Sequence, residues 1–297
     1  MKDSSTSALQ PSVQQVSMEV AHVCELERGA LHYGRCGEGP PLFLIMGFMA
    51  RGRAWRAQVE ALSDRYQVVW FDHRGVGDSP GPAARSMQEF AEDCVALLDH
   101  LGWESAHVCG VSMGGMIAQE LALTAPTRVR SLTLIVTQPG GIMSMIPTLR
   151  GIPRFLRAQL ATTPEGRIRA LRSLLVPPQA QALVDVSEID RKLREDFSPK
   201  PPTSTRLSHL RAIRKHDTRR RLKDLRAPTL IVRAEDDLLV HPKHSLTLSR
   251  LIPHAELVSF EHAGHGVIRQ RNVPLNETLA RHLADAERSA SGEDIAP

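Results

Sequence analysis

A serine, a group of acids and two histidines have the types and order needed for chemistry. Ser112 lies in the pattern Gly110-Val-Ser-Met-Gly114, directly after an apolar run and directly before a segment of helical periodicity. The pattern alone arises by chance in roughly one chain of this length in ten, so its strand, turn and helix context matters more. In such a turn the serine takes strained backbone angles, and its hydroxyl stands at a helix N-terminus that favours negative charge. The sequence therefore predicts a nucleophilic serine.

A serine hydroxyl becomes a useful nucleophile when a histidine takes its proton and a carboxylate orients that histidine. Downstream of Ser112, an apolar run at residues 229–233 leads into Glu235, Asp236 and Asp237. After the next apolar run come His262 and His265. The order serine, acid, histidine suits a strand-edge site, although spacing alone leaves the choice among these acids and histidines open.

Eight short apolar runs, most of them followed by amphipathic segments, indicate strands that alternate with helices. We expect strands at residues 20–25, 30–36, 42–46, 67–71, 106–111, 131–136, 229–233 and 255–258. We expect helices at residues 53–63, 86–101, 113–125, 242–250 and 267–287. The sequence predicts an α/β fold with a mostly parallel, eight-stranded sheet and helices on both faces.

The alternation pauses after residue 138 and resumes near residue 227. The stretch between is helical in pattern, interrupted by prolines, and basic: residues 150–222 hold 17 Lys or Arg against 7 Asp or Glu. We therefore predict a core at residues 19–138 and 222–288, with a helical cap at residues 139–221 inserted after the sixth strand. Residues 1–18 and 289–297 are expected to be disordered tails.

Composition excludes several classes of protein. The longest apolar stretches fall well short of the roughly 20 residues needed to cross a bilayer, and the N-terminal stretch has no apolar secretory signal. The four cysteines lack metal-site spacing and are expected to be reduced, which favours a cytoplasmic protein. A net charge of +4 is mild, and the basic run at residues 211–223 lacks the aromatic residues that stack on bases, so no nucleic acid is expected. We expect a small-molecule substrate, no metal, no cofactor, and a monomer or homodimer.

Taken together, these motifs resemble the α/β-hydrolase superfamily, and specifically its capped serine hydrolases such as methylesterases and small-lactone hydrolases. The resemblance covers about residues 20–287 and is weakest in the cap. The run Phe-Asp-His-Arg-Gly-Val-Gly-Asp-Ser at residues 71–79 is similar to the family's turn after the fourth strand. The register of the family's acid loop selects Asp237 over Asp236, and its Gly-His pair selects His265 as the base.

The resemblance also implies an oxyanion hole made of two backbone amides, those of Phe48 and Met113. This chain has Met46-Gly47 where the family more often has His-Gly, which removes a polar side chain and makes the pocket floor more apolar. We expect Met46, Gly47, Met49 and Met116 to contact the substrate.

These residues predict a cofactor-free serine hydrolase that cleaves a small carboxylic ester or lactone through an acyl-enzyme on Ser112. Three alternatives remain open. A carbon–carbon bond hydrolase would use the same triad with cap arginines binding a dienoate. A perhydrolase would share the triad, although such enzymes usually lack a large cap. A ligand receptor or scaffold that keeps the hydrolase fold would typically show an eroded triad.

Overall fold

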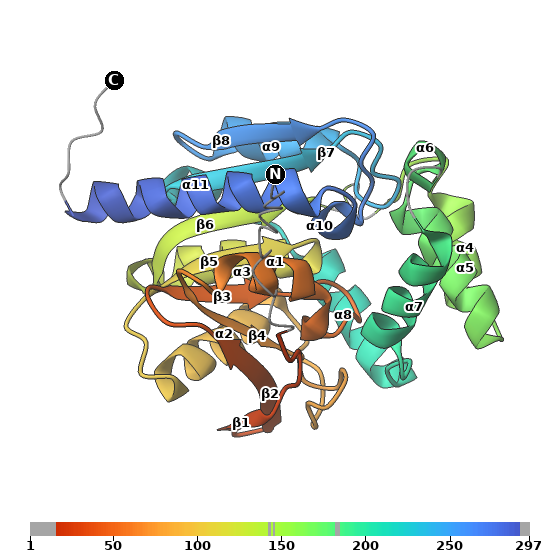
Figure 1. Ribbon diagram of the computed structural model, residues 1–297, viewed down its shortest axis with the longest axis horizontal. Helices are drawn as coiled ribbons and strands as arrows, with labels where there is room; N and C mark the ends of the chain where they lie inside the picture. Colours follow the sequence, from red (N-terminus) through yellow and green to blue (C-terminus); the bar gives the residue numbers. More distant parts are fainter. Residues whose placement is uncertain (1–15, 142–143, 145, 182–184, 292–297) are drawn as a thin grey trace, which may run out of the picture.

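Eight strands form a twisted central sheet in the computed structural model, which describes residues 16–141, 144, 146–181 and 185–291 (Figure 1). The spatial order is β1-β2-β4-β3-β5-β6-β7-β8. Strands β1 and β2 pair antiparallel to each other, β2 pairs antiparallel to β4, and all pairs from β4 to β8 are parallel. The bounds are His22–Leu26, Gly29–Cys36, Pro41–Ile45, Gln67–Phe71, Ala106–Val111, Val129–Ile135, Thr229–Ala234 and Glu256–Phe260 for β1 to β8. This confirms the predicted fold class.

Helices cover both faces of the sheet (Figure 1). One face carries α1 (Arg56–Leu62), α10 (Val267–Gln270) and α11 (Asn272–Ser291), and the other carries α2 (Met87–His100), α3 (Met113–Thr124) and α9 (Lys243–Leu251). Alternate residues of each strand enter opposite apolar clusters: in β3, Leu42 and Leu44 pack toward α1, whereas Phe43 and Ile45 pack toward α2 and α3. Because both faces are buried, the parallel strands read as continuous apolar runs.

The helix expected at residues 267–287 is divided. Arg271, between α10 and α11, has φ −125° and ψ 34°, which is outside helical geometry. Pro274 lies in the first turn of α11, where a missing amide hydrogen costs nothing, and this position explains why a new helix begins there. The helix expected at residues 53–63 is likewise a short 3-10 turn, Gly52–Trp55, followed by α1.

The predicted tails are each corrected at their inner ends. Helix α11 continues to Ser291, so residues 289–291 are helical. They extend an amphipathic helix that packs on the sheet. Met18 is only 4% exposed and joins the apolar cluster that contains Trp55. Residues 1–15 and 292–297 of the predicted tails lie outside the described residues.

The segment between β6 and β7, here called the insertion (residues 139–221), forms helices at one end of the sheet (Figure 1). They are α4 (Ile152–Leu160), α5 (Pro164–Leu175), α6 (Pro178–Gln181), α7 (Val186–Phe197) and α8 (Thr203–Lys215). A 3-10 turn, Leu222–Asp224, leads from them back into β7. None of the helices in the described ranges is long and apolar enough to cross a membrane.

Candidate active site

Ser112 occupies a sharp turn between the end of β5 and the start of α3. Its backbone has φ 56° and ψ −120°, a strained conformation for a residue with a side chain. The flanking glycines are required by close packing. A Cβ on Gly110 would lie 2.3 Å from the carbonyl oxygen of Gly114, and a Cβ on Gly114 would lie 2.1 Å from that of Ile45. The hydroxyl of Thr137, at the end of β6, donates to the Ser112 carbonyl at 2.7 Å and holds the turn from behind.

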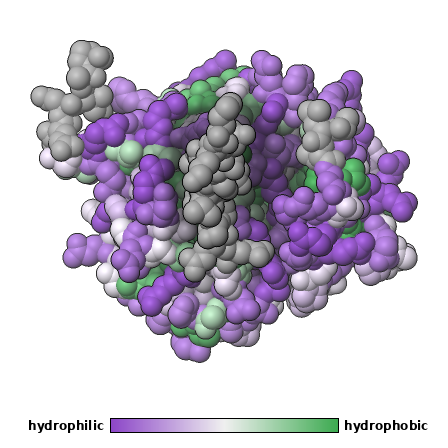
Figure 2. Space-filling model, in the orientation of Figure 1, coloured by the Kyte–Doolittle hydropathy of each residue, from purple (hydrophilic) through white to green (hydrophobic). Residues whose placement is uncertain are grey.

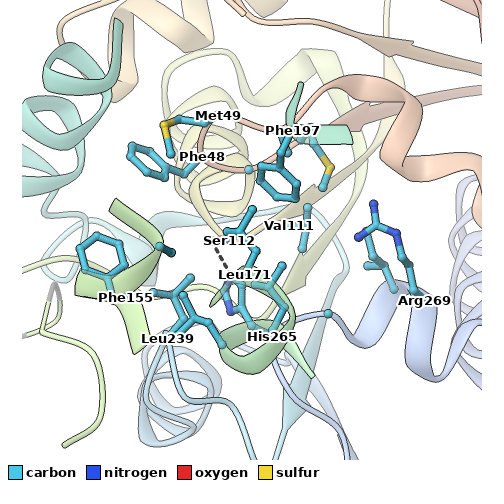
Figure 3. A pocket seen from close by; sticks show the side chains of 18 of the residues that line it. Phe48, Met49, Val111, Ser112, Phe155, Leu171, Phe197, Leu239, His265 and Arg269 are labelled. Atoms are coloured by element: carbon cyan, nitrogen blue, oxygen red, sulfur yellow. Dashed lines mark hydrogen bonds between the residues drawn. The ribbon is translucent and has the colours of Figure 1, made fainter. Parts of the chain in front are cut away.

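The structure brings Ser112, His265 and Asp237 together from the carboxyl ends of three strands. His265 Nε2 lies 2.9 Å from Ser112 Oγ, drawn as a dashed line in Figure 3, and His265 Nδ1 lies 2.7 Å from Asp237 Oδ2. Asp237 and His265 are only 3% and 7% exposed. Because a carboxylate can only accept a hydrogen bond, Nδ1 carries the ring proton, and Nε2 can accept the serine proton.

The second carboxylate oxygen of Asp237 is fixed by the backbone. Its Oδ1 accepts hydrogen bonds from the amides of Leu239 at 2.8 Å and Val240 at 2.9 Å. These two bonds turn Oδ2 toward the imidazole of His265. The loop after β7 therefore sets both the position and the rotation of this acid.

The rival residues lie elsewhere. Asp236 is partly exposed, and its amide donates to the Ala263 carbonyl. Glu235 is exposed and forms an ion pair with Arg233 at 3.3 Å. His262 is exposed as well. None of these three side chains hydrogen-bonds to Ser112 or His265 in the described structure.

The loop after β3 passes directly over Ser112. A Cβ on Gly47 would lie 3.1 Å from Ser112 Cβ and 3.7 Å from its Oγ, so the backbone of this loop lies close to the serine. The amides of Phe48, in this loop, and of Met113, at the start of α3, donate to no acceptor among the described residues. Two unpaired amide donors beside a serine oxygen are the groups an oxyanion would require.

His73, in the turn after β4, holds this loop in place, a role the sequence analysis missed. Its Nε2 donates to the Met46 carbonyl at 2.9 Å, and the side chain is 1% exposed. The rings of Phe71 and Phe90 pack edge-on against the imidazole. Burial lowers its pKa to about 4, so the ring is neutral near pH 7. The run at residues 71–79 resembles the family's turn after the fourth strand, although nothing in it identifies Met46 as the partner of His73.

A pocket of about 680 Å³ opens beside Ser112 and is lined almost entirely by apolar side chains (Figure 3). Met46, Gly47 and Met49, which we expect to contact the substrate, are among its lining residues. Sequence reasoning missed the side chains that the insertion supplies, because helical periodicity identifies an apolar face without identifying what it covers. These include Phe155, Ala158, Leu171, Leu174, Leu175 and Phe197.

Among the described residues that line this pocket, Arg269 is the charged one, and it lies four residues after His265 in the sequence. Its guanidinium pairs with the buried carboxylate of Asp196 on α7. The cationic charge is therefore already compensated, and the pocket remains an apolar environment.

A second cavity of about 550 Å³ reaches Ser112 from another side. Met113 and Met116 line it, together with Leu210 and Ile213 of α8. Met116 therefore contributes to this cavity and not to the larger pocket. Phe48 and Leu239 are among the residues that border both spaces. The serine hydroxyl thus stands between two apolar spaces.

Residues 40–269 match a family model described as "alpha/beta hydrolase fold". One similar curated protein, "Putative carbamate hydrolase RutD" from Azorhizobium caulinodans, is 37% identical over 256 residues, which span 84% of this chain and 93% of that protein. A protein with the same name from Serratia proteamaculans is 32% identical and is matched over 85% of its length by 77% of this chain.

Solved structures give a similar result. The structure described as "Est816 as an N-Acyl homoserine lactone degrading enzyme" is 28% identical, with a TM-score of 0.73 over 87% of this chain and 99% of that one. The enol-lactonase from Burkholderia xenovorans LB400 has a TM-score of 0.75 over 86% of this chain and 97% of that one. At 24% identity, this second likeness concerns the fold alone.

Proposed function

Because the chain belongs to the alpha/beta hydrolase fold family and is a hydrolase, we propose that it is a serine hydrolase whose catalytic residues are Ser112, His265 and Asp237. The observation that carries the proposal is the continuous chain of contacts: Ser112 Oγ to His265 Nε2 at 2.9 Å, and His265 Nδ1 to Asp237 Oδ2 at 2.7 Å. The strained turn that exposes the serine and the two unpaired amides beside it add support.

In this mechanism Ser112 Oγ attacks the substrate carbonyl carbon while its proton passes to His265 Nε2. The amides of Phe48 and Met113 donate to the oxyanion of the tetrahedral intermediate. The C–O bond breaks, and the alcohol leaves with the proton from His265. A water molecule then gives a proton to His265 Nε2 and attacks the acyl carbon. The bond from that carbon to Ser112 Oγ breaks, Oγ takes the proton back from His265, and the acid is released. Asp237 keeps the imidazole in the reactive tautomer throughout.

We propose a small carboxylic ester or lactone with an apolar part as the substrate. Small-molecule sites are mostly apolar clefts with a few polar groups, and the larger pocket, which has an apolar lining beside Ser112 and His265, is of this kind. A polar substrate would leave its groups without hydrogen-bond partners there, which costs free energy. Among the described residues, none of the insertion's arginines lines this pocket, which disfavours the dienoate substrate of a carbon–carbon bond hydrolase.

A carbamate is the second candidate substrate, because the relatives carry that name. The same residues would attack a carbamate carbonyl by the same steps. The apolar pocket favours a carbamate ester with an apolar substituent over a small free carbamate.

Labelling with a fluorophosphonate probe tests the proposal, with Ser112→Ala as the control. We expect the wild type to be labelled and the variant to remain unlabelled. Nitrophenyl esters of increasing acyl length, a matched nitrophenyl carbamate and a vinylogous diketone then distinguish the substrate classes. We expect turnover of the esters to be fastest. An unlabelled, folded wild type would contradict the serine mechanism and favour a binding protein, whereas labelling with cleavage of only the diketone would contradict the ester assignment.

A further inference from the structure

The segment from Ile146 to Leu160 exposes large apolar side chains to solvent. Ile146 is 46% exposed, Leu149 89%, Leu156 49% and Leu160 75%. Eight large hydrophobic residues are exposed within the described ranges, and these four all fall in fifteen residues of sequence. Single exposed leucines are ordinary, but a local concentration of them marks an interaction surface. We call these four residues the apolar patch.

Helix α4 within this segment has two apolar sides. Phe155 and Ala158, three residues apart, line the pocket beside Ser112. Leu156 and Leu160, one turn apart, point to solvent. The pocket accounts for the first side and leaves the second without a partner. The patch is therefore on the outer surface of a wall of the candidate active site.

The charged residues within the segment from Ile146 to Leu160 are all arginines. Arg150, Arg154 and Arg157 alternate with its leucines, and the sequence has no Asp or Glu between Glu120 and Glu165. None of these three arginines forms an ion pair with a carboxylate in the described part of the chain. Hydrophobic surface lies over the insertion amid hydrophilic surroundings in Figure 2.

This combination identifies the kind of partner. A second copy of the chain would place the same patch against itself in a two-fold interface, which brings the three arginines toward their own copies. An anionic lipid surface satisfies both features, since leucines enter the boundary between headgroups and acyl chains while arginines bind phosphate groups. We propose that the apolar patch and these arginines dock the protein on an anionic lipid surface.

Docking would present the α4 wall of the pocket to the lipid. The inference concerns binding of the chain to a surface, so it stands whether or not the proposed ester chemistry is correct. Its measurement is correspondingly separate from the hydrolysis assay.

Cosedimentation with vesicles of phosphatidylcholine alone or mixed with phosphatidylglycerol tests the proposal. Three arginines at about 1 kcal/mol each predict binding to the anionic vesicles roughly a hundredfold tighter than to the neutral ones. The variant Leu149→Glu/Leu160→Glu should lose at least about tenfold in affinity for the anionic vesicles. Val273→Glu is the matched control, because Val273 is 62% exposed on α11 and lies outside the patch.

The far-UV circular dichroism spectrum and the thermal unfolding midpoint report whether each variant is folded. We expect all of them to match the wild type in both measurements. Equal sedimentation of the patch variant and the Val273→Glu control would overturn the proposal, as would the absence of wild-type binding. A wild-type dimer in light scattering that the patch variant converts to a monomer would overturn it too, because the patch would then be an interface between copies.

Discussion

Replacing Asp237 with asparagine should abolish most of the activity without unfolding the protein. The two side chains have nearly the same shape, so the loop after β7 can stay in place. The asparagine oxygen should remain on the amides of Leu239 and Val240, which approach Asp237 Oδ1 at 2.8 and 2.9 Å. Its NH₂ group then faces His265 Nδ1, which must accept a hydrogen bond and therefore loses its proton. The proton moves to Nε2, the atom that faces Ser112 Oγ, and the histidine no longer serves as a base.

The magnitude follows from the cost of the alternative rotamer. Turning the asparagine so that its oxygen faces His265 would set the NH₂ group against the amides of Leu239 and Val240. Each buried donor left without an acceptor costs about 1–3 kcal/mol, so the reactive arrangement lies about 2–6 kcal/mol higher. That range corresponds to a loss in kcat of between about 30-fold and about 3 × 10⁴-fold. The upper part agrees with the roughly 10⁴-fold loss that the same substitution causes in another serine hydrolase.

Steady-state hydrolysis of a nitrophenyl ester, together with the rate of fluorophosphonate labelling, measures the effect. Asp236→Asn is the matched control, because Asp236 is adjacent in sequence but makes no hydrogen bond to His265. It should retain activity within about twofold. A fully active Asp237→Asn, or a large loss in Asp236→Asn alone, would refute the assignment of the acid.

Three further outcomes follow from the geometry. His73→Phe should lower kcat by about tenfold to a hundredfold with little change in KM, because the Met46 carbonyl loses its donor, whereas His73→Gln, which keeps an N–H there, should restore most of the rate in stopped-flow acylation. Gly114→Ala should unfold or inactivate the protein, since its Cβ would lie 2.1 Å from a backbone oxygen, while Gly102→Ala, with open space around it, should cost only about 1–2 kcal/mol in urea denaturation. Burial lowers the pKa of His73 to about 4 and that of His209 to about 3, so below about pH 6.5 the unfolded chain binds more protons than the folded one, and the free energy of unfolding falls as the pH falls. His209→Phe should reduce that slope by about 1.4 kcal/mol per pH unit. A wild-type free energy of unfolding that does not change between about pH 6.5 and 5 would contradict this.

The parts of the fold that the sequence predicted well are those governed by local rules. Strands buried on both faces need apolar runs, so the bounds predicted from the sequence, residues 106–111 and 67–71, coincide with the bounds of β5 and β4. The turn at Ser112 could be predicted because its flanking glycines are required by backbone contacts that no side chain allows. The choice of Asp237 needed the family resemblance. Of the three acids, Asp237 is the one that is buried and accepts hydrogen bonds from two backbone amides, which supports the proposed choice.

The pocket could not be predicted because its walls come from tertiary packing. Leu171, Leu174 and Leu175 form an apolar face of α5, and the same pattern would suit any helix that packs on a core. Likewise, the burial of Met18 depends on the position of Trp55, to which no local pattern connects it. Long-range contacts of this kind have no signature in the spacing of residues.

Met46 shows how a backbone contact and the packing of a pocket can act on one residue. The loop after β3 is held through the Met46 backbone carbonyl, which accepts a hydrogen bond from His73 in the turn after the neighbouring strand β4. Because that bond does not depend on the side chain of residue 46, the methionine is free to line the pocket and make its floor apolar. The rigidity of the loop and the polarity of the pocket are thus set by different atoms of one residue. A change of side chain at residue 46 should therefore alter which substrates bind more than how fast the bound carbonyl is attacked.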